Sequence, residues 1–149
     1  MLSHLEPYLL MPSALTPTAL LERAALIAET VTINTLDAGP VRVRNTPLYD
    51  AWLLPWEIGA ATSLHAHDGA HGAYVALSGV FRETIASASA VRERLVLAGE
   101  RVAFRPDYTH RLAAAAGPAV SLHLFSPPRA AGPCTPSLAP ALTSLASAV

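Results

Sequence analysis

Cysteine is almost absent from this sequence of 149 residues, which contains one, Cys134. A single thiol cannot form an internal disulfide, and this agrees with a reducing compartment. Cys134 lies in a proline-rich stretch near the C-terminus, where the pattern assigns it no catalytic role. A disulfide framework is therefore excluded.

Charge is also scarce, at 14% of the residues, against about 25% in an average soluble domain. The 10 basic and 11 acidic side chains are mixed along the sequence, without a stripe of Lys and Arg. Such a stripe would be needed to neutralise the phosphates of a nucleic acid, so nucleic acid is not an expected partner. Hydrophobic residues reach 52%. This composition indicates a large buried interior or a subunit interface, and a homodimer is a reasonable expectation.

The first residues lack the features of an export signal or a membrane span. No Lys or Arg precedes the apolar residues, and Glu6 and Pro7 interrupt them. A signal peptide needs a basic start and an unbroken apolar run, and a membrane helix needs a longer run. We expect a cytoplasmic protein without membrane contacts.

The length fits one domain, residues 1–149. Thr16 followed by Pro17 is typical of a helix start, and apolar residues then recur at helical spacing, so a helical segment is expected over about 16–30. Short β-type runs, TSLHAH among them, fill about 41–126 at the spacing of an all-β sandwich or barrel. The Ala, Pro and Ser-rich stretch of about 127–149 is expected to be an extended arm or a loose tail.

Two histidines in TSLHAH carry the strongest chemical signal. His65 and His67 are two residues apart on a predicted strand, so both side chains leave the same face and can bind one metal ion, while Ala66 points away. A His-x-His pair alone is a weak motif. Its surroundings must strengthen it.

Those surroundings resemble the two sequence motifs of the cupin superfamily. Gly59, Gly72 and Gly79 frame the pair as in Gly-x5-His-x-His-x4-Glu-x6-Gly, except that Gly72 replaces the Glu. The second motif is matched in GERVAFRPDYTH, which ends on His110. The resemblance implies a small jelly-roll β-barrel behind the N-terminal helical segment, with His110 as the third metal ligand.

Three neutral imidazoles leave more net positive charge on a divalent metal than two histidines and a carboxylate do. Such a site favours an anionic ligand, for example a thiolate. Nickel, copper, cobalt and zinc suit three imidazoles as well as iron does, so the residues leave the identity of the metal open.

Two longer segments resemble the cysteine dioxygenase family of thiol dioxygenases. They are WEIGAATSLHAHDGAHGAYVALSGVFRET and THRLAAAAGPAVSLHLFSPP. The resemblance implies Fe(II) on His65, His67 and His110, with O2 as co-substrate; Ni(II) stays an alternative. It also implies that Ser121 and His123 belong to a Ser-His-Tyr relay, whose Tyr is replaced here by Phe125.

Members of the family that this sequence resembles hold the substrate carboxylate with an arginine upstream of the tryptophan, and the resemblance implies such an arginine here. Arg44 is the first candidate and Arg42 the second, since a guanidinium binds a carboxylate through two parallel hydrogen bonds. An exposed position at a strand edge is the competing interpretation for Arg44, and His123 alone in an apolar strand also suits a core residue held by one hydrogen bond.

The resemblance implies oxidation of a small aminothiol by O2, with L-cysteine giving cysteine sulfinate. Because Phe125 lacks the family hydroxyl, a diverted product, formed by decarboxylation and S–N bond formation toward a sulfonamide, is an alternative. The residues also agree with a different thiol substrate, such as 3-mercaptopropionate or cysteamine, and with a non-catalytic cupin that binds a metal or small ligand. If neither Arg42 nor Arg44 faces the metal, a substrate without a carboxylate gains ground.

Overall fold

The computed structural model describes residues 14–31, 39–129 and 131–138. The predicted helical segment is confirmed as α2, Pro17–Ala28. The Thr16 hydroxyl accepts a hydrogen bond from the Ala19 N–H at 3.1 Å, and Pro17 opens the first turn, where its missing N–H costs nothing. Within the described ranges, no helix has the length and apolar character needed to cross a membrane.

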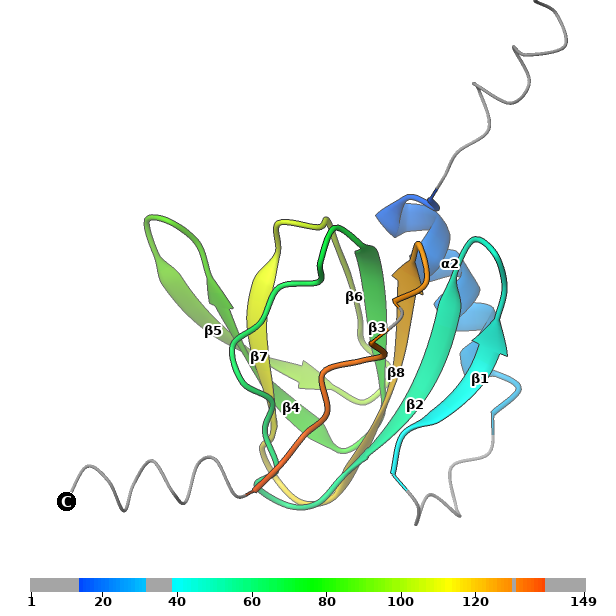
Figure 1. Cartoon of the computed structure of the whole chain (residues 1–149). Coiled ribbons are helices and arrows are strands. Elements are labelled where there is room, and N and C mark those ends of the chain that lie inside the picture. The colour runs from blue at the N-terminus through cyan, green and yellow to red at the C-terminus, as the bar shows by residue number, and fades with distance from the viewer. Residues whose placement is uncertain (1–13, 32–38, 130, 139–149) are drawn as a thin grey trace, which may run out of the picture.

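The rest of the described chain is built from antiparallel strands in two sheets. The five-stranded sheet has the order β1-β2-β8-β3-β6 and the three-stranded sheet the order β5-β4-β7. The strands are β1 Val41–Asn45, β2 Asp50–Trp56, β3 His71–Ser78, β4 Val80–Ala86, β5 Val91–Leu97, β6 Arg101–Phe104, β7 Thr109–Ala114 and β8 Ala119–Ser126. The sheets form facing walls (Figure 1), and this jelly-roll arrangement confirms the predicted all-β cupin fold.

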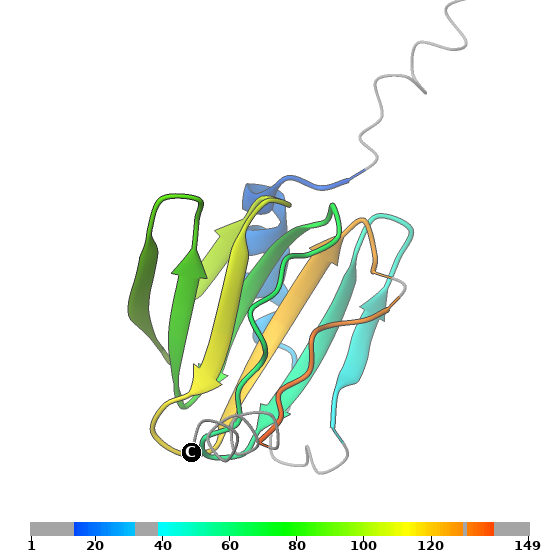
Figure 2. The ribbon, with the colours of Figure 1, turned by 60° about the vertical axis from the view of Figure 1, so that its left-hand side comes forward.

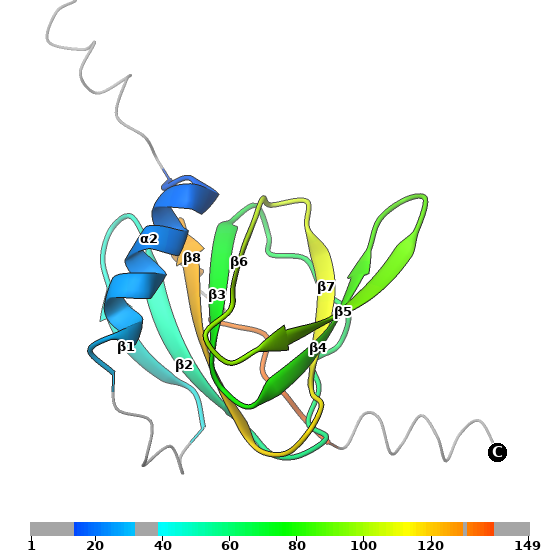
Figure 3. The ribbon, with the colours of Figure 1, turned by 180° about the vertical axis from the view of Figure 1, so that it is seen from behind.

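Alternation along the strands divides the core into two layers. On β8, Leu122 and Leu124 pack against helix residues such as Leu20 and Ala24 on the outer face of the five-stranded sheet. Figure 3 shows α2 lying across that face. The opposite side chains of the same strand, Phe125 among them, enter the cluster between the sheets. Strand alternation therefore gives β8 one helix-facing side and one side that faces the interior.

The segment carrying His65 and His67 differs from the prediction. It is not a strand but a loop between β2 and β3, joined to β7 by isolated bridges at Ala61 and His65. Turns at Gly59 and at Asp68, both with positive φ, lie on either side of the two bridges. β7, to which this loop is bridged, carries His110.

The C-terminal stretch is an ordered arm as far as the structure describes it. Ala61 and Ser137 exchange backbone hydrogen bonds of 3.2 and 2.9 Å. The arm runs beside the histidine loop on the open side of the two sheets (Figure 2). The assignment of about 127–149 as an extended arm or a loose tail stays a prediction, and 139–149 lie outside the described residues.

Candidate metal centre

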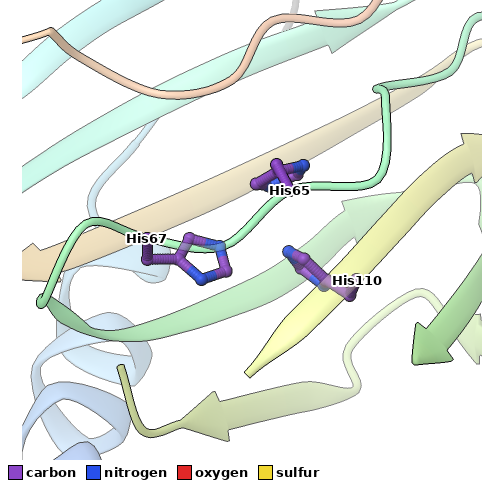
Figure 4. Close-up of side chains that lie close together, drawn as sticks. All are labelled: His65, His67 and His110. Carbon is purple, nitrogen blue, oxygen red and sulfur yellow. The ribbon is translucent and has the colours of Figure 1, made fainter. Parts of the chain in front are cut away.

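Three imidazoles converge between the histidine loop and β7 (Figure 4). The backbones of His65 and His110 are joined by two hydrogen bonds of 2.9 and 3.0 Å, which place the rings side by side. Their ring centroids lie 4.8 Å apart, and those of His67 lie 5.0 Å from His65 and 4.9 Å from His110. One nitrogen from each ring lies within 4.8 Å of the others, so the three residues could hold a metal ion.

Hydrogen bonds to the second nitrogen of each ring prepare the cluster for a metal. The Nδ1 atoms of His65 and His67 lie 2.8 and 3.2 Å from the carbonyl oxygens of Ser63 and Tyr108. His110 Nδ1 lies 2.7 Å from a carboxylate oxygen of Glu83. Carbonyl and carboxylate oxygens only accept, so each Nδ1 carries the proton and each Nε2 keeps its lone pair for a metal. The donor set therefore fits a divalent transition metal.

Burial keeps two of the rings neutral. Burial, followed by the charges of His110 and His65, lowers the pKa of His67 to about 2. Burial also lowers the pKa of His110 more than Glu83 raises it. For His65, burial favours a lower pKa, but the Cys134 thiol and the Ser63 carbonyl outweigh it and the pKa is raised. Only neutral imidazole binds a metal. His67 and His110 are therefore in the metal-binding form at neutral pH.

Glu83 is the functional residue that the sequence analysis missed. It is fully buried on β4 and accepts three hydrogen bonds, from His110 Nδ1 at 2.7 Å, Tyr108 Oη at 2.9 Å and Arg94 Nε at 2.7 Å. Burial favours a raised pKa, but His110 and Arg94 outweigh it and hold the pKa of Glu83 below its ordinary value. A carboxylate in this position orients the ligand ring and increases its basicity. The strand pattern held the signal, because Phe81, Glu83 and Ile85 alternate inward.

The relay positions on β8 lie in the interior, as the alternation predicts. Ser121 Oγ and His123 Nε2 are 2.8 Å apart, and Trp56 Nε1 donates to Ser121 Oγ at 2.8 Å. His123 lies outside the three-histidine cluster, and its ring stacks on Tyr74 at 5.4 Å. Phe125 faces His67 with ring centroids 5.9 Å apart. Their catalytic roles stay a prediction.

Gly72 is needed for packing. A Cβ there would lie 2.1 Å from the Phe104 ring, and Phe104 in turn packs 4.2 Å from the His67 ring. Phe104 thus occupies the space that an acidic side chain at position 72 would need. The missing carboxylate of the first cupin motif is therefore replaced by an aromatic wall beside the cluster.

Neither predicted arginine hydrogen-bonds to the cluster. Arg44 is exposed on β1 and its Nη1 donates to the carbonyl of Val43 at 2.7 Å. Arg42 is also exposed, with its guanidinium 5.3 Å from the Trp52 ring. Binding of a carboxylate by either residue stays a prediction.

The C-terminal arm brings Arg129 and Cys134 to the site. The Cys134 Sγ atom lies 3.9 Å from Ser63 Oγ.

The metal-free protein is expected to lose stability as the pH falls below about 6.5. Burial, followed by the charges of His110 and His65, lowers the pKa of His123 to about 3, while the unfolded chain titrates near 6.5. The unfolded state therefore gains protons first, and stability declines from pH 6.5 toward the folded-state pKa. The cost is about 1.4 kcal/mol per pH unit for each such histidine. Thermal unfolding between pH 7.5 and 5 measures it, and a His123→Gln variant that keeps the full pH slope would contradict the assignment.

The comparisons with known proteins agree with this geometry. Solved structures with a similar fold include KdgF from Halomonas sp. (TM-score 0.56, 19% identity, 69% of this chain and 92% of that one). A protein from Bacillus halodurans has TM-score 0.60, 12% identity and coverage of 77% and 93%. A cupin protein from Bacteroides fragilis has TM-score 0.53, 20% identity and coverage of 64% and 82%. At these identities the likeness shows the fold alone.

A search of curated proteins finds no match to the sequence. The model of the family described as cysteine dioxygenase type I, however, matches residues 12–132. This range includes the histidine loop, β4 with Glu83, β7 and β8, and thus every element that builds the metal centre. The chain therefore belongs to the cysteine dioxygenase type I family.

Proposed function

We propose that the protein oxidises a small aminothiol with O2 at a metal held by His65, His67 and His110, and that L-cysteine is the substrate. One observation carries the proposal: the Nδ1 atom of every ring is engaged by an acceptor. Each ring therefore offers its Nε2 to the metal, and a ligand set of three imidazoles adds no negative charge. A divalent ion there keeps its full charge and favours a thiolate.

The bound metal would supply Lewis acidity that lowers the pKa of the substrate thiol and would bring the thiol and O2 together. The remaining contributions come from the chain. The bridge between His65 and His110 and the Glu83 carboxylate hold the rings in register. Phe104 and Phe125 line the site beside His67 with apolar surface, which limits the access of water to the thiol.

The hydrogen bond between Ser121 and His123 would fix the orientation of the His123 ring next to the site. Trp56 Nε1 can only donate, so Ser121 Oγ accepts from it and is free to donate its own proton to His123 Nε2. That arrangement fixes the His123 ring and places its remaining proton on Nδ1. Burial, ahead of nearby charge, lowers the pKa of His123 to about 3, so it acts as a neutral hydrogen-bonding group.

The reaction balances without a further reductant. One O2 adds both oxygen atoms to the sulfur of one cysteine: the O–O and S–H bonds break and two S–O bonds form. The sulfur loses four electrons, which reduce O2, and the product is a sulfinate and a proton. Phe125 offers no hydroxyl at the position where the family has tyrosine. The identity of the product is for that reason a separate question from the identity of the substrate.

The test is oxygen consumption by protein loaded with Fe(II), and separately with Ni(II), in the presence of L-cysteine, 3-mercaptopropionate or cysteamine. We expect turnover with L-cysteine and cysteine sulfinate as the product by mass spectrometry. A product that has lost carbon dioxide and gained an S–N bond would support the diverted reaction instead. No oxygen uptake with any thiol and either metal would contradict the enzymatic proposal and favour a metal-binding cupin without catalysis.

A further inference from the structure

Arg129 is the first charged residue of the C-terminal arm, and its side chain folds back toward the site. Its guanidinium carbon lies 5.3 Å from the centroid of the Phe125 ring. Nη2 donates to Asp68 Oδ2 at 2.8 Å. The side chain is only 12% exposed, although its partner Asp68 is 79% exposed. Arg129 is thus held between the β8 end and the histidine loop.

One side of this guanidinium has no partner. Arg129 Nη1 is buried and makes no hydrogen bond within the part of the chain that the structure describes. A buried donor without an acceptor costs free energy, more so when it is charged. The Asp68 carboxylate satisfies only Nη2 and faces solvent, where an ion pair is weak. The unsatisfied Nη1 therefore favours a ligand that brings an anionic oxygen.

The position of Arg129 connects it to the histidine cluster. Phe125, on which it lies, is the ring that faces His67. Asp68, to which it is paired, directly follows His67 in the chain. These two contacts place the guanidinium against the ring beside His67 and against the residue that follows His67 in the histidine loop.

The two arginines of β1 offer no comparable donor. Arg44 and Arg42 are exposed, and water satisfies an exposed guanidinium. Arg129 is the only arginine with a buried, unpartnered nitrogen among the described residues. An anion gains most from the donor that water does not reach, since charge-assisted hydrogen bonds strengthen when desolvated.

We propose that Arg129 binds the carboxylate of the substrate through Nη1, and so restricts the site to thiols that carry a carboxylate. This inference rests on the proposed function, because it concerns the ligand of the same metal centre. The proposal distinguishes L-cysteine and 3-mercaptopropionate, which carry a carboxylate, from cysteamine, which has none. Without Arg129, the exposed positions of Arg42 and Arg44 would have favoured cysteamine.

Equilibrium binding of each thiol to Fe(II)-loaded protein, measured without oxygen by calorimetry, tests the proposal. Arg129→Met keeps an unbranched stem over Phe125 and removes the charge. We expect this variant to lower the affinity for L-cysteine and for 3-mercaptopropionate by about tenfold to a hundredfold, the loss typical of a charged hydrogen bond. Cysteamine binding is expected to change less than about twofold. Arg129→Lys should recover part of the affinity, because it returns the charge without the planar fork.

Three matched variants complete the experiment. Arg44→Ala and Arg42→Ala should leave all three affinities unchanged. Asp68→Asn removes the competing carboxylate, and because asparagine tolerates the positive φ of 51° at this position, the turn is kept. Asp68→Asn is expected to tighten the two carboxylate thiols and not cysteamine. Metal content and melting temperature, measured on every variant, identify any that fails to fold.

The outcomes separate this inference from the proposed function. Arg129-dependent binding of L-cysteine without oxygen uptake would support carboxylate binding by Arg129 and contradict the proposed thiol oxidation. Oxygen uptake with L-cysteine that Arg129→Met leaves unchanged would support the thiol oxidation and contradict the role of Arg129. Equal weakening of all three thiols, a selective loss in Arg44→Ala or Arg42→Ala, or wild-type preference for cysteamine would each overturn the role of Arg129. Wild-type protein that binds none of the thiols would overturn both.

Discussion

A His65→Ala protein purified without added metal should contain almost no transition metal, whereas the wild type should contain close to one ion per chain. In the proposed site His65 is one of three ligands among the described residues, so its loss leaves two imidazoles. Because removal of a residue that merely supports a ligand already costs about tenfold to a hundredfold in affinity, the loss of a ligand should cost more. His65 is only half-buried, so its removal is the least damaging to the fold among the three.

Elemental analysis of the purified protein measures the effect and names the metal. His71→Ala is the matched control, because His71 is a half-buried histidine at the start of β3 that lies outside the cluster. Its variant should keep the wild-type metal content. Full occupancy in His65→Ala, or an equal loss in His71→Ala, would contradict the assigned ligand set.

Glu83→Gln is expected to weaken metal binding by about tenfold to a hundredfold. The carboxylate serves Arg94 with one oxygen and His110 and Tyr108 with the other. A glutamine has one oxygen and one NH2 group, so at least one of these donors faces another donor. If His110 Nδ1 loses its acceptor, the ring turns and its Nε2 becomes a less basic ligand.

Titration against a chromophoric chelator measures this affinity independently of catalysis. Arg94→Met is the control, because Arg94 is 47% exposed and touches Glu83 without touching the metal ligand. It should weaken the metal by much less. Equal effects of the two variants, or wild-type affinity in Glu83→Gln, would show that Glu83 acts only on the structure. Melting temperatures of the metal-free variants separate a loss of ligand geometry from a loss of folding.

The two residues that the sequence analysis missed show why part of the site needed the fold. Glu83 occupies an inward position in an alternating strand, and a carboxylate on such a face requires a partner. Nothing local identifies His110, 27 positions away, as that partner. Arg129 stands in an Ala and Pro-rich segment without periodicity, so its contacts with Phe125 and Asp68 depend entirely on the path of the arm.

The candidates Arg42 and Arg44 show the same limit. They lie on β1, an edge strand with an irregularity in its register between these residues. A register change alters where a side chain points without changing the local pattern. Their place in the sequence therefore does not decide where their side chains point, and binding of a carboxylate by either stays a prediction.

The order of residues alone determined the fold class, the helix start at Thr16 and the inner face of β8, because capping and a period of two are properties of neighbouring residues. It also identified the His65–His67 pair, because a His-x-His motif with its flanking glycines is a pattern of nearby residues. Only the tertiary structure decided that the pair lies on a loop, that His110 pairs with Glu83, and that Arg129 lies between Phe125 and Asp68. These contacts join segments that are distant in the chain, and such contacts depend on how sheets and loops pack together.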